Sequence, residues 1–359
     1  MKILVTGGGG YIGAVLCDRL LQAGHHVRVL DRLYWGCEPL AKVLDRIELV
    51  QGDVRAFDAS VLDGVDGVAH LAGLSNDPTA EYNPEANWEM NATATEALAA
   101  ACKARGVKRF TFGSSASIYD GLGDGPFDED SEVSPRGAYS RSKFAAERSL
   151  LALAGKDFSP VILRQGTVYG HSPRMRLDLV VNTFIKDALL RGTLFLHGGG
   201  WMWRPLVDVS DVAEVHLRCL ELEPGEIGGE IFNVVHDNFQ IRQLAMLVSG
   251  SLSMHQRHVT LEDAPLPAIN RNYRCTNRKL EKRIGFTPRV TVLESIERML
   301  SFLPIDDPIE LAHPRYYNIK WMTLLEDVTA SQRPFSSVWS LDAAALGVDS
   351  QTVSSRHTV

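Results

Sequence analysis

The sequence is poor in cysteine, and the cysteines it has do not form a framework. The five are odd in number, scattered and without a CxxC pair: Cys17, Cys37, Cys102, Cys219 and Cys275. A disulfide scaffold or a zinc site is therefore not expected, and we assign no metal ligands. Free thiols of this kind are typical of a reduced, cytoplasmic protein.

Long apolar runs and an excess of positive charge are also missing. No run approaches the 18 or so apolar residues of a membrane span and no charged-then-apolar leader is present, so we expect neither membrane insertion nor secretion. Lys and Arg number 37 against 44 Asp and Glu, a net charge of -7, which argues against a nucleic-acid partner. With 359 residues, 45% of them hydrophobic, the chain can bury a sizeable core in one large or two modest domains. We expect a soluble, mildly acidic enzyme.

The stretch around which the chain is organised is KILVTGGGGYIG, residues 2–13. An apolar run ending at Thr6 is followed by four glycines and then by apolar residues at helical spacing, which predicts a strand, a turn and a helix. Gly7, Gly10 and Gly13 fall three apart, so the backbone can turn tightly and approach a ligand closely. Amides at the start of the helix then favour a phosphate or a diphosphate.

An acidic residue follows the second predicted strand. This strand, residues 26–30, ends in Asp31, whose carboxylate can accept hydrogen bonds from the two hydroxyls of an adenosine ribose. Because the same carboxylate would repel a 2′-phosphate, the sequence favours NAD over NADP. Arg32 weighs against this choice, since an adjacent arginine can pair with a phosphate.

Strands and helices alternate through the first half, which predicts a parallel, doubly wound sheet. Further strands are expected at residues 47–50, 67–71 and 109–112. The carboxyl ends of the strands carry glycine, serine or acid, and ligands bind at that edge of such a sheet. Asp53, after the third strand, can either accept from an adenine amino group or cap the next helix.

The residues best suited to chemistry lie between Ser115 and Lys143. Tyr139 and Lys143 stand four apart on a predicted helix, so both side chains lie on one face. A phenol with a pKa near 10 is a poor base at neutral pH, but an adjacent cation favours the phenolate. Ser115, at the end of the fifth strand, can hydrogen-bond the same substrate oxygen. A Tyr-xxx-Lys pair on a helix is usually exposed and has no function, but the position of this pair in a dinucleotide-binding fold favours a catalytic role.

Over roughly residues 1–300 the chain resembles the extended short-chain dehydrogenase/reductase family, and within it the nucleotide-sugar epimerases and dehydratases. The motifs that carry the resemblance occur in the family's order: TGGGGYIG, Asp31, Gly52-Asp53-Val54, His70-Leu71-Ala72-Gly73, Asn91 in NATAT, SSASIY at 114–119 and YSRSK at 139–143.

The resemblance implies a Rossmann-type doubly wound parallel sheet with a smaller C-terminal α/β substrate domain. It implies that Tyr139 is the catalytic base and acid, that Lys143 orients it and binds the nicotinamide ribose, and that Ser115 holds the reacting hydroxyl. The residues expected to surround NAD are Gly7, Gly10, Tyr11, Ile12, Gly13, Asp31, Arg32, Asp53, Val54, Leu71, Ala72, Gly73, Ser75, Asn91, Tyr139, Lys143 and Gln165.

The second half of the chain resembles the family's nucleotide-sugar site. Thr167 stands in the crossing loop where an asparagine is usual, and Arg204 occupies the position whose guanidinium grips a diphosphate, a task that suits its bidentate geometry. Arg271 and Arg274 are further diphosphate candidates. The residues assigned to the substrate are Ser115, Thr167, Asn182, Arg204 and Arg271.

The residues after Ser115 bear on the reaction type. Dehydratases and decarboxylases of this family typically carry an extra acid there, whereas this chain has Ala116 and Ser117. The sequence therefore favours an NAD-dependent nucleotide-sugar epimerase, most simply at C4, which needs only reversible hydride transfer. The alternatives are a dehydrogenase or 4-keto-reductase, a 4,6-dehydratase, and a non-catalytic dinucleotide sensor.

We expect three parts in the chain: an NAD-binding domain at residues 1–165, a substrate domain at 166–312 with some crossing between the two, and an extension at 313–359. A homodimer is expected because the family pairs two helices across subunits, and small residues in 92–104 suit close helix packing.

Overall fold

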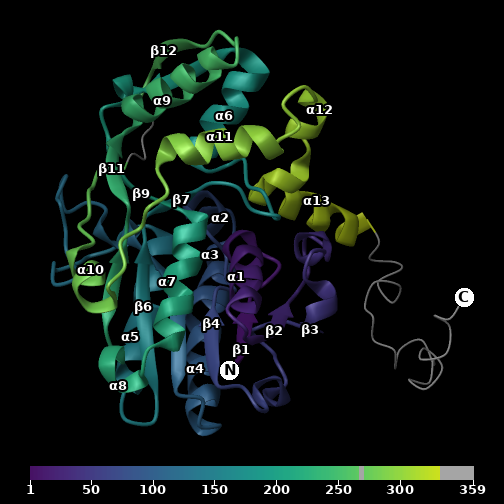
Figure 1. Ribbon diagram of the computed structural model, residues 1–359, viewed down its shortest axis with the longest axis vertical. Helices are drawn as coiled ribbons and strands as arrows, with labels where there is room; N and C mark the ends of the chain where they lie inside the picture. Colours follow the sequence, from purple (N-terminus) through teal and green to yellow (C-terminus); the bar gives the residue numbers. More distant parts are fainter. Residues whose placement is uncertain (267–270, 332–359) are drawn as a thin grey trace, which may run out of the picture.

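The computed structural model describes residues 1–266 and 271–331 (Figure 1). The end of the expected extension, residues 332–359, lies outside the described part of the chain. In the described part no helix is long and apolar enough to cross a membrane.

The core of the molecule is a seven-stranded sheet in which every strand is parallel to its neighbours, in the order β10-β6-β5-β4-β1-β2-β3. The strand order reverses beside β1, which is the point where ligands bind in such sheets. The predicted Rossmann-type α/β fold is confirmed. The strands are β1 (Lys2–Thr6), β2 (His26–Asp31), β3 (Ile47–Gln51), β4 (Gly67–His70), β5 (Arg109–Ser115), β6 (Ser159–Gln165) and β10 (Ile231–Val234).

Helices cover both faces of this sheet. On one face α1 and α7 lie side by side, and their apolar residues form one buried cluster with β1 and β2 (Figure 1). On the other face α4 and α5 pack against β4, β5 and β6. The helices of this region are α1 (Tyr11–Gln22), α2 (Asp77–Tyr82), α3 (Pro84–Trp88), α4 (Ala94–Ala104), α5 (Ala138–Leu153), α7 (Val209–Glu221) and α8 (Pro224–Ile227), with a turn of π-helix at Glu89–Thr93.

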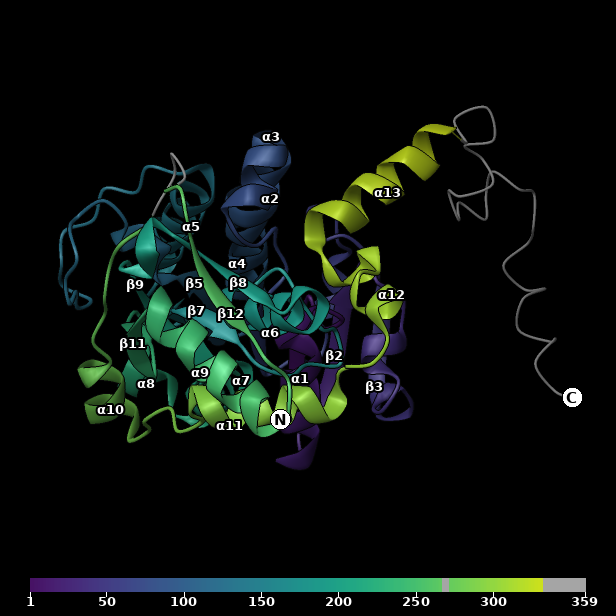
Figure 2. The same ribbon diagram turned by 90° about the horizontal axis from the view of Figure 1, so that it is seen from above.

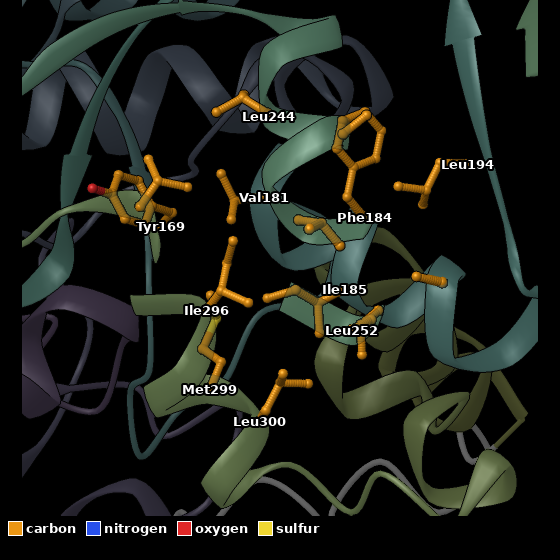
Figure 3. Close-up of a cluster of buried hydrophobic side chains, with 14 of the residues drawn as sticks. Tyr169, Val181, Phe184, Ile185, Leu194, Leu244, Leu252, Ile296, Met299 and Leu300 are labelled. Atoms are coloured by element: carbon orange, nitrogen blue, oxygen red, sulfur yellow. The ribbon is translucent and has the colours of Figure 1, made fainter. Parts of the chain in front are cut away.

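A second, smaller region is built on its own apolar core (Figure 3). Side chains of α6, α9 and α11 point toward one another there, among them Val181, Leu244 and Ile296, all fully buried. The elements of this region are β7 (Thr167–Tyr169), α6 (Val180–Arg191), β8 (Thr193–His197), β9 (Trp203–Asp208), β11 (Asp237–Gln240), α9 (Ile241–Met254), β12 (Thr260–Ala264) and α11 (Val292–Phe302). The helix α10 (Arg278–Ile284) packs instead against β10 of the large sheet.

The chain passes between the two regions more than once. After β7 and β9 it returns to the large sheet, where α7 packs on α1 and β10 pairs with β6, and it then leaves again for β11. The edge strand of the large sheet, β10, therefore comes later in the sequence than β7, α6, β8 and β9 of the second region.

The last described segment, residues 304–331, runs back toward the first strands of the large sheet (Figures 1 and 2). It contains α12 (Pro308–Leu311), a 3-10 turn at Pro314–Tyr316 and α13 (Asn318–Ser331). Glu326 of α13 accepts a hydrogen bond of 2.5 Å from the hydroxyl of Tyr82 in α2. The beginning of the expected extension is therefore a folded part of the molecule.

Strands β5 and β6 are tied to α5 by a buried ion pair. Arg164 Nη2 lies 2.8 Å from Glu147 Oε2, and the two residues are only 3% and 1% exposed. Ser114 donates to Glu147, and Arg164 Nη1 donates to the Tyr119 hydroxyl at 2.8 Å. The charges compensate each other and are hydrogen-bonded, which offsets the cost of burying them.

Replacing Glu147 by glutamine should lower the free energy of unfolding by about 3–5 kcal/mol, because Arg164 would be left as a buried, uncompensated charge. The measurement is chemical denaturation of the purified protein. Lys42→Ala, which removes an ion pair to Asp18 from a lysine that is 73% exposed, is the control and should cost less than about 1 kcal/mol. Equal losses in the two variants would contradict the role of the buried pair.

Candidate active site

Two glycines of the turn after β1 are so closely packed against backbone that neither position has room for a side chain. Gly7 has φ of 73°, and a Cβ there would lie 2.7 Å from the amide nitrogen of Ala72 after β4. A Cβ on Gly13 would lie 2.1 Å from the carbonyl oxygen of Gly7. The start of α1 therefore sits directly on the turn, and its free amides face the carboxyl edge of the sheet, as an anion-binding turn requires.

Two cavities, of about 240 and 100 Å³, meet over this turn. Residues that line both include Gly7, Gly10, Trp35, Leu71, Gly73, Ser75 and Asn318. The predicted residues Tyr11, Ile12, Gly13, Ser115, Tyr139, Gln165, Thr167 and Arg271 line the larger cavity. Asp31, Arg32, Asp53, Val54 and Ala72 line the smaller one. Most of the residues assigned from the sequence are thus brought together.

The smaller cavity has the features of an adenosine site. Asp31 accepts hydrogen bonds from the amides of Gly9 at 2.9 Å and Leu33 at 2.7 Å, which fix its carboxylate at the end of β2. Burial raises the pKa of Asp31, and these amide bonds oppose the shift.

Arg32 beside it is already engaged, because its Nη1 lies 2.8 Å from Asp53 Oδ2. An arginine neutralised in this way is a poor ligand for a 2′-phosphate, which supports NAD. Asp53 also accepts from the Arg55 amide at 2.9 Å, so it closes a turn and does not cap a helix.

Asn91 lies behind the wall of the cavities on the π-helical turn. Its Nδ2 donates to the carbonyl of Leu74 and to Asn87 Oδ1, both at 2.8 Å. Its buried Oδ1 has no hydrogen-bond partner among the described residues, and a Cβ on Gly73 would come within 2.3 Å of it. Single turns of π-helix inside α-helices often occur at functional sites, and the position of this one fits that tendency.

Ser115, Tyr139 and Lys143 meet at the end of β5. Ser115 and Tyr139 both line the larger cavity there, and Ser115 and the backbone of Asn76 favour the phenolate of Tyr139. Lys143, one turn along α5, is 5% exposed, and its Nζ donates to the carbonyl of Gly113 at 2.9 Å. The helical spacing predicted for Tyr139 and Lys143 is correct, and it places both side chains against the same strand.

The pKa values of Tyr139 and Lys143 differ from the expectation that the charge of Lys143 favours the Tyr139 phenolate. Burial raises the pKa of Tyr139 to about 12, and the Ser115 hydrogen bond and the charge of Arg176 oppose this rise. Burial lowers the pKa of Lys143 to about 8, against the opposing charge of Glu147. Arg176, which lines the larger cavity, is thus a cation whose charge favours the Tyr139 phenolate in this structure, a role that sequence reasoning gave to Lys143 alone.

Two residues assigned to the substrate lie away from the cavity surface. Asn182 is fully buried and donates to the Tyr11 hydroxyl at 3.2 Å and to the carbonyl of Arg176 at 2.8 Å. Arg204 donates to the backbone carbonyls of Trp203 and Arg271. In this structure these two side chains support the wall of the site.

Sequence reasoning missed several lining residues: Trp35, Asn76, Ser114, Arg174, Arg176, Tyr273 and Asn318. The only local signal was the pair of arginines in SPRMR, directly after the crossing strand β7. A buried arginine cannot be told from an exposed one by its neighbours in the sequence. Arg271 was expected, and the structure adds its ion pair to Asp77 at the start of α2.

The site fits a dinucleotide. The glycine turn after β1, where an added Cβ would clash, lies between the carboxylate of Asp31 and the Ser115-Tyr139 pair. When bound, the nicotinamide of such a cofactor accepts and returns a hydride. The chain's own residues would hold its ribose at Asp31 and its diphosphate at the start of α1.

Comparisons with known proteins agree with this geometry. The chain is 28% identical over 319 residues to a UDP-glucose 4-epimerase of Corynebacterium glutamicum, an alignment that covers 82% of this chain and 93% of the relative. The structure of MoeE5 in complex with UDP-glucose and NAD is 27% identical, with a TM-score of 0.73 over 84% of this chain and 98% of that one. DesIV, a dTDP-glucose 4,6-dehydratase from Streptomyces venezuelae with NAD and TYD bound, is 25% identical, with a TM-score of 0.72 over 84% and 98%.

A family model described as the NAD dependent epimerase/dehydratase family matches residues 3–234. The match spans the large sheet from β1 to β10 and includes Ser115, Tyr139 and Lys143. The cofactor expected from Asp31, NAD, is therefore confirmed at the level of the family. The chain belongs to the NAD dependent epimerase/dehydratase family.

Proposed function

We propose that this protein is a nucleotide-sugar epimerase that inverts C4 of its sugar by transient hydride transfer to tightly bound NAD. The observation that carries the proposal is the composition of the larger cavity. Its described lining contains serines, tyrosines and arginines but no carboxylate and no histidine. A dehydratase needs a further acid or base to expel water, whereas an epimerase needs one proton-transfer group beside the hydride acceptor.

The residues that follow β5 also favour an epimerase over a dehydratase. Ala116 and Ser117 are buried, and the Ser115 hydroxyl donates to Ser117 Oγ at 3.0 Å. The positions where related dehydratases carry acid are thus filled by small side chains. The names of relatives, such as the UDP-glucose 4-epimerase of Corynebacterium glutamicum, support C4 and a UDP-sugar.

In the proposed mechanism the sugar hydroxyl lies between Ser115 and Tyr139. Ser115 orients the hydroxyl, and Tyr139 removes its proton when the carbon is oxidised and returns it when the carbon is reduced. The charge of Arg176 favours the phenolate. NAD held by Asp31 and the start of α1 would supply the reversible hydride acceptor for C4, while Ser115 and Tyr139 hold the oxygen of the sugar in place.

Arg271 is the proposed ligand of the substrate diphosphate, because it lines the larger cavity beside Tyr273. Its ion pair to Asp77 joins the two regions of the molecule across the site. A nucleotide diphosphate would compete with Asp77 for this guanidinium, so substrate binding and the position of α2 are coupled. Thr167 lines the same cavity and remains a proposed sugar contact.

The expected homodimer stays a prediction. It is supported by the outer face of α4, where Ala97, Ala100 and Ala104 are exposed and would allow close helix packing. A cytoplasmic location likewise remains an expectation.

The function can be tested with a panel of UDP-sugars and TDP-sugars followed by NMR. We expect interconversion of C4 epimers, retention of the substrate's own hydrogen at C4 in deuterated water, and no net change in nicotinamide absorbance. Loss of water from the sugar would identify a dehydratase, and stoichiometric accumulation of reduced cofactor would identify a dehydrogenase. Either result would overturn the proposal.

Tyr139→Phe should lower turnover by at least the roughly 10²- to 10⁴-fold that is typical of a lost general acid/base. The ring and its packing are kept, so NAD content and nucleotide affinity should be close to those of the wild type. Turnover and ligand affinity should be measured on the same preparation. A variant that retains full activity would remove Tyr139 from the mechanism.

Arg176→Gln should move the pH-rate profile toward alkaline pH. The positive charge of Arg176 lowers the pKa of Tyr139, so its loss raises that pKa, and less phenolate is present at any given pH. Activity should fall most at neutral pH and recover as the pH rises, while Arg176→Lys, which keeps the charge, should shift the profile less.

Arg278→Gln is the matched control, since Arg278 is exposed at the start of α10. An unchanged profile in Arg176→Gln would exclude this electrostatic role.

A further inference from the structure

The C-terminal segment, residues 313–331, contributes to the place where the two cavities meet. Asn318, the first residue of α13, lines both cavities, as does Trp35 in the loop after β2. Asn318 Nδ2 donates to Ser75 Oγ at 3.2 Å, and its amide donates to Asp178 at 3.2 Å. A residue from outside the part of the chain that the family model matches therefore reaches the middle of the cofactor site.

Arg174 is held at the same place from three sides. Its backbone amide donates to Ser172 Oγ at 3.2 Å, and that hydroxyl donates to the carbonyl of Tyr11, the first residue of α1, at 2.7 Å. The guanidinium carbon lies 3.9 Å from the centre of the Trp35 ring. Its Nη2 donates to Asn318 Oδ1 at 2.5 Å. Arg174 is thus fixed close to the start of α1 with only 4% of its surface exposed.

Arg174 has no ion-pair partner within the described part of the chain, and the carboxylate of Asp178 offsets its charge only in part. Its neighbour Arg176 is paired with Asp178 at 2.8 Å, which leaves two guanidinium groups and one carboxylate in this segment. Arg174 forms no ion pair with a described residue, and its buried Nε has no hydrogen-bond partner there. A buried cation without a partner is costly, so this arrangement is suited to a group that supplies negative charge.

We propose that Arg174 binds the diphosphate of NAD and that Asn318 holds the guanidinium in place, so that the C-terminal segment 313–331 completes the cofactor site. The inference goes beyond the proposed reaction, because it concerns how the cofactor is retained and holds for any chemistry at Tyr139. Burial and the charge of Arg176 lower the pKa of Arg174 to about 9, and a bound diphosphate would raise it again.

The geometry favours the diphosphate of the dinucleotide over that of the sugar nucleotide. Arg174 is tied to Tyr11 through Ser172, and so it sits beside the helix start that faces the glycine turn. Its other partners, Trp35 and Asn318, both reach the smaller, adenosine cavity, which Arg271 does not line. Helix amides and a guanidinium together make a strong phosphate site.

The C-terminal segment is anchored so that it can hold this arginine. Trp321 Nε1 donates to the carbonyl of Tyr34 at 2.7 Å, and Trp35 Nε1 donates to the carbonyl of Arg315 at 3.1 Å. Met322 lines the smaller cavity. The segment is thus bonded to the loop after β2 on both sides of Asn318. Figure 2 shows the segment running back over β2.

The first experiment compares Arg174→Gln with the wild type and with Arg278→Gln, an exposed arginine at the start of α10. NAD content after purification, the NAD dissociation rate and the affinity for UDP are measured on each protein. Losing a charge-assisted bond to phosphate should weaken NAD binding by roughly 10- to 100-fold. UDP affinity should be unchanged, Arg174→Lys should be less affected, and Arg278→Gln should behave as the wild type.

The second experiment is a double-mutant cycle of Arg174→Gln and Asn318→Ala, read as NAD affinity. If Asn318 acts by holding Arg174, Asn318→Ala should weaken NAD binding in the wild-type background and have little further effect in Arg174→Gln. Additive losses would show that Asn318 acts independently and would overturn that half of the proposal.

Three outcomes would overturn the assignment of Arg174. Unchanged NAD affinity in Arg174→Gln would exclude the contact, and a loss of UDP affinity alone would assign the arginine to the substrate diphosphate. The third outcome is a purely structural role. In that case the NAD-stripped variant would have a lower thermal midpoint than the NAD-stripped wild type, but added NAD would raise both midpoints by the same amount. If Arg174→Gln does not fold, Arg174→Lys and Asn318→Ala give the same NAD readouts. None of these outcomes depends on which sugar reaction the enzyme performs.

Discussion

The structure depends above all on how closely three pieces of backbone approach one another at the turn after β1. Gly7 touches the chain after β4, and Gly13 touches Gly7, at distances that no Cβ permits. This contact sets α1 directly over the carboxyl edge of the sheet, where the strand order reverses. Both cavities, the anchor of Arg174 through Tyr11 and the position of Asp31 all follow from where α1 begins.

Charge in the interior is arranged in two different ways. Around Glu147 and Arg164 each charge is paired and hydrogen-bonded, and the result is a rigid link behind the ends of β5 and β6. Around Arg174 and Arg176 positive charge exceeds negative charge in a segment that lines the site. The first arrangement is suited to holding β5 and β6 in place, and the second is suited to receiving an anionic ligand.

The sequence predicts what local patterns encode. The glycine turn, Asp31 and the Tyr139-Lys143 spacing each depend on residues that are neighbours in the chain, and the structure has the expected turn, strand end and helix face. Asn318 could not be found in this way, because it meets Ser75 from 243 positions away. Arg176 was missed for a related reason: its effect on Tyr139 arises from burial and proximity in space, neither of which a dibasic stretch reveals. Asn182 and Arg204 occur in the expected motifs, yet their side chains are bonded within the wall of the site.

The return of the chain to the large sheet has a consequence for how the protein is made. All seven residues of β6 are buried in the finished molecule, and β10, which covers its outer edge, follows it only after β7, α6, β8, β9 and α7. During synthesis β6 therefore emerges as an uncovered, apolar edge strand, the kind of surface that pairs with other chains. The nascent chain must keep this edge protected until residues 231–234 have left the ribosome, so a ribosomal pause between β6 and β10 would prolong the period in which aggregation competes with folding.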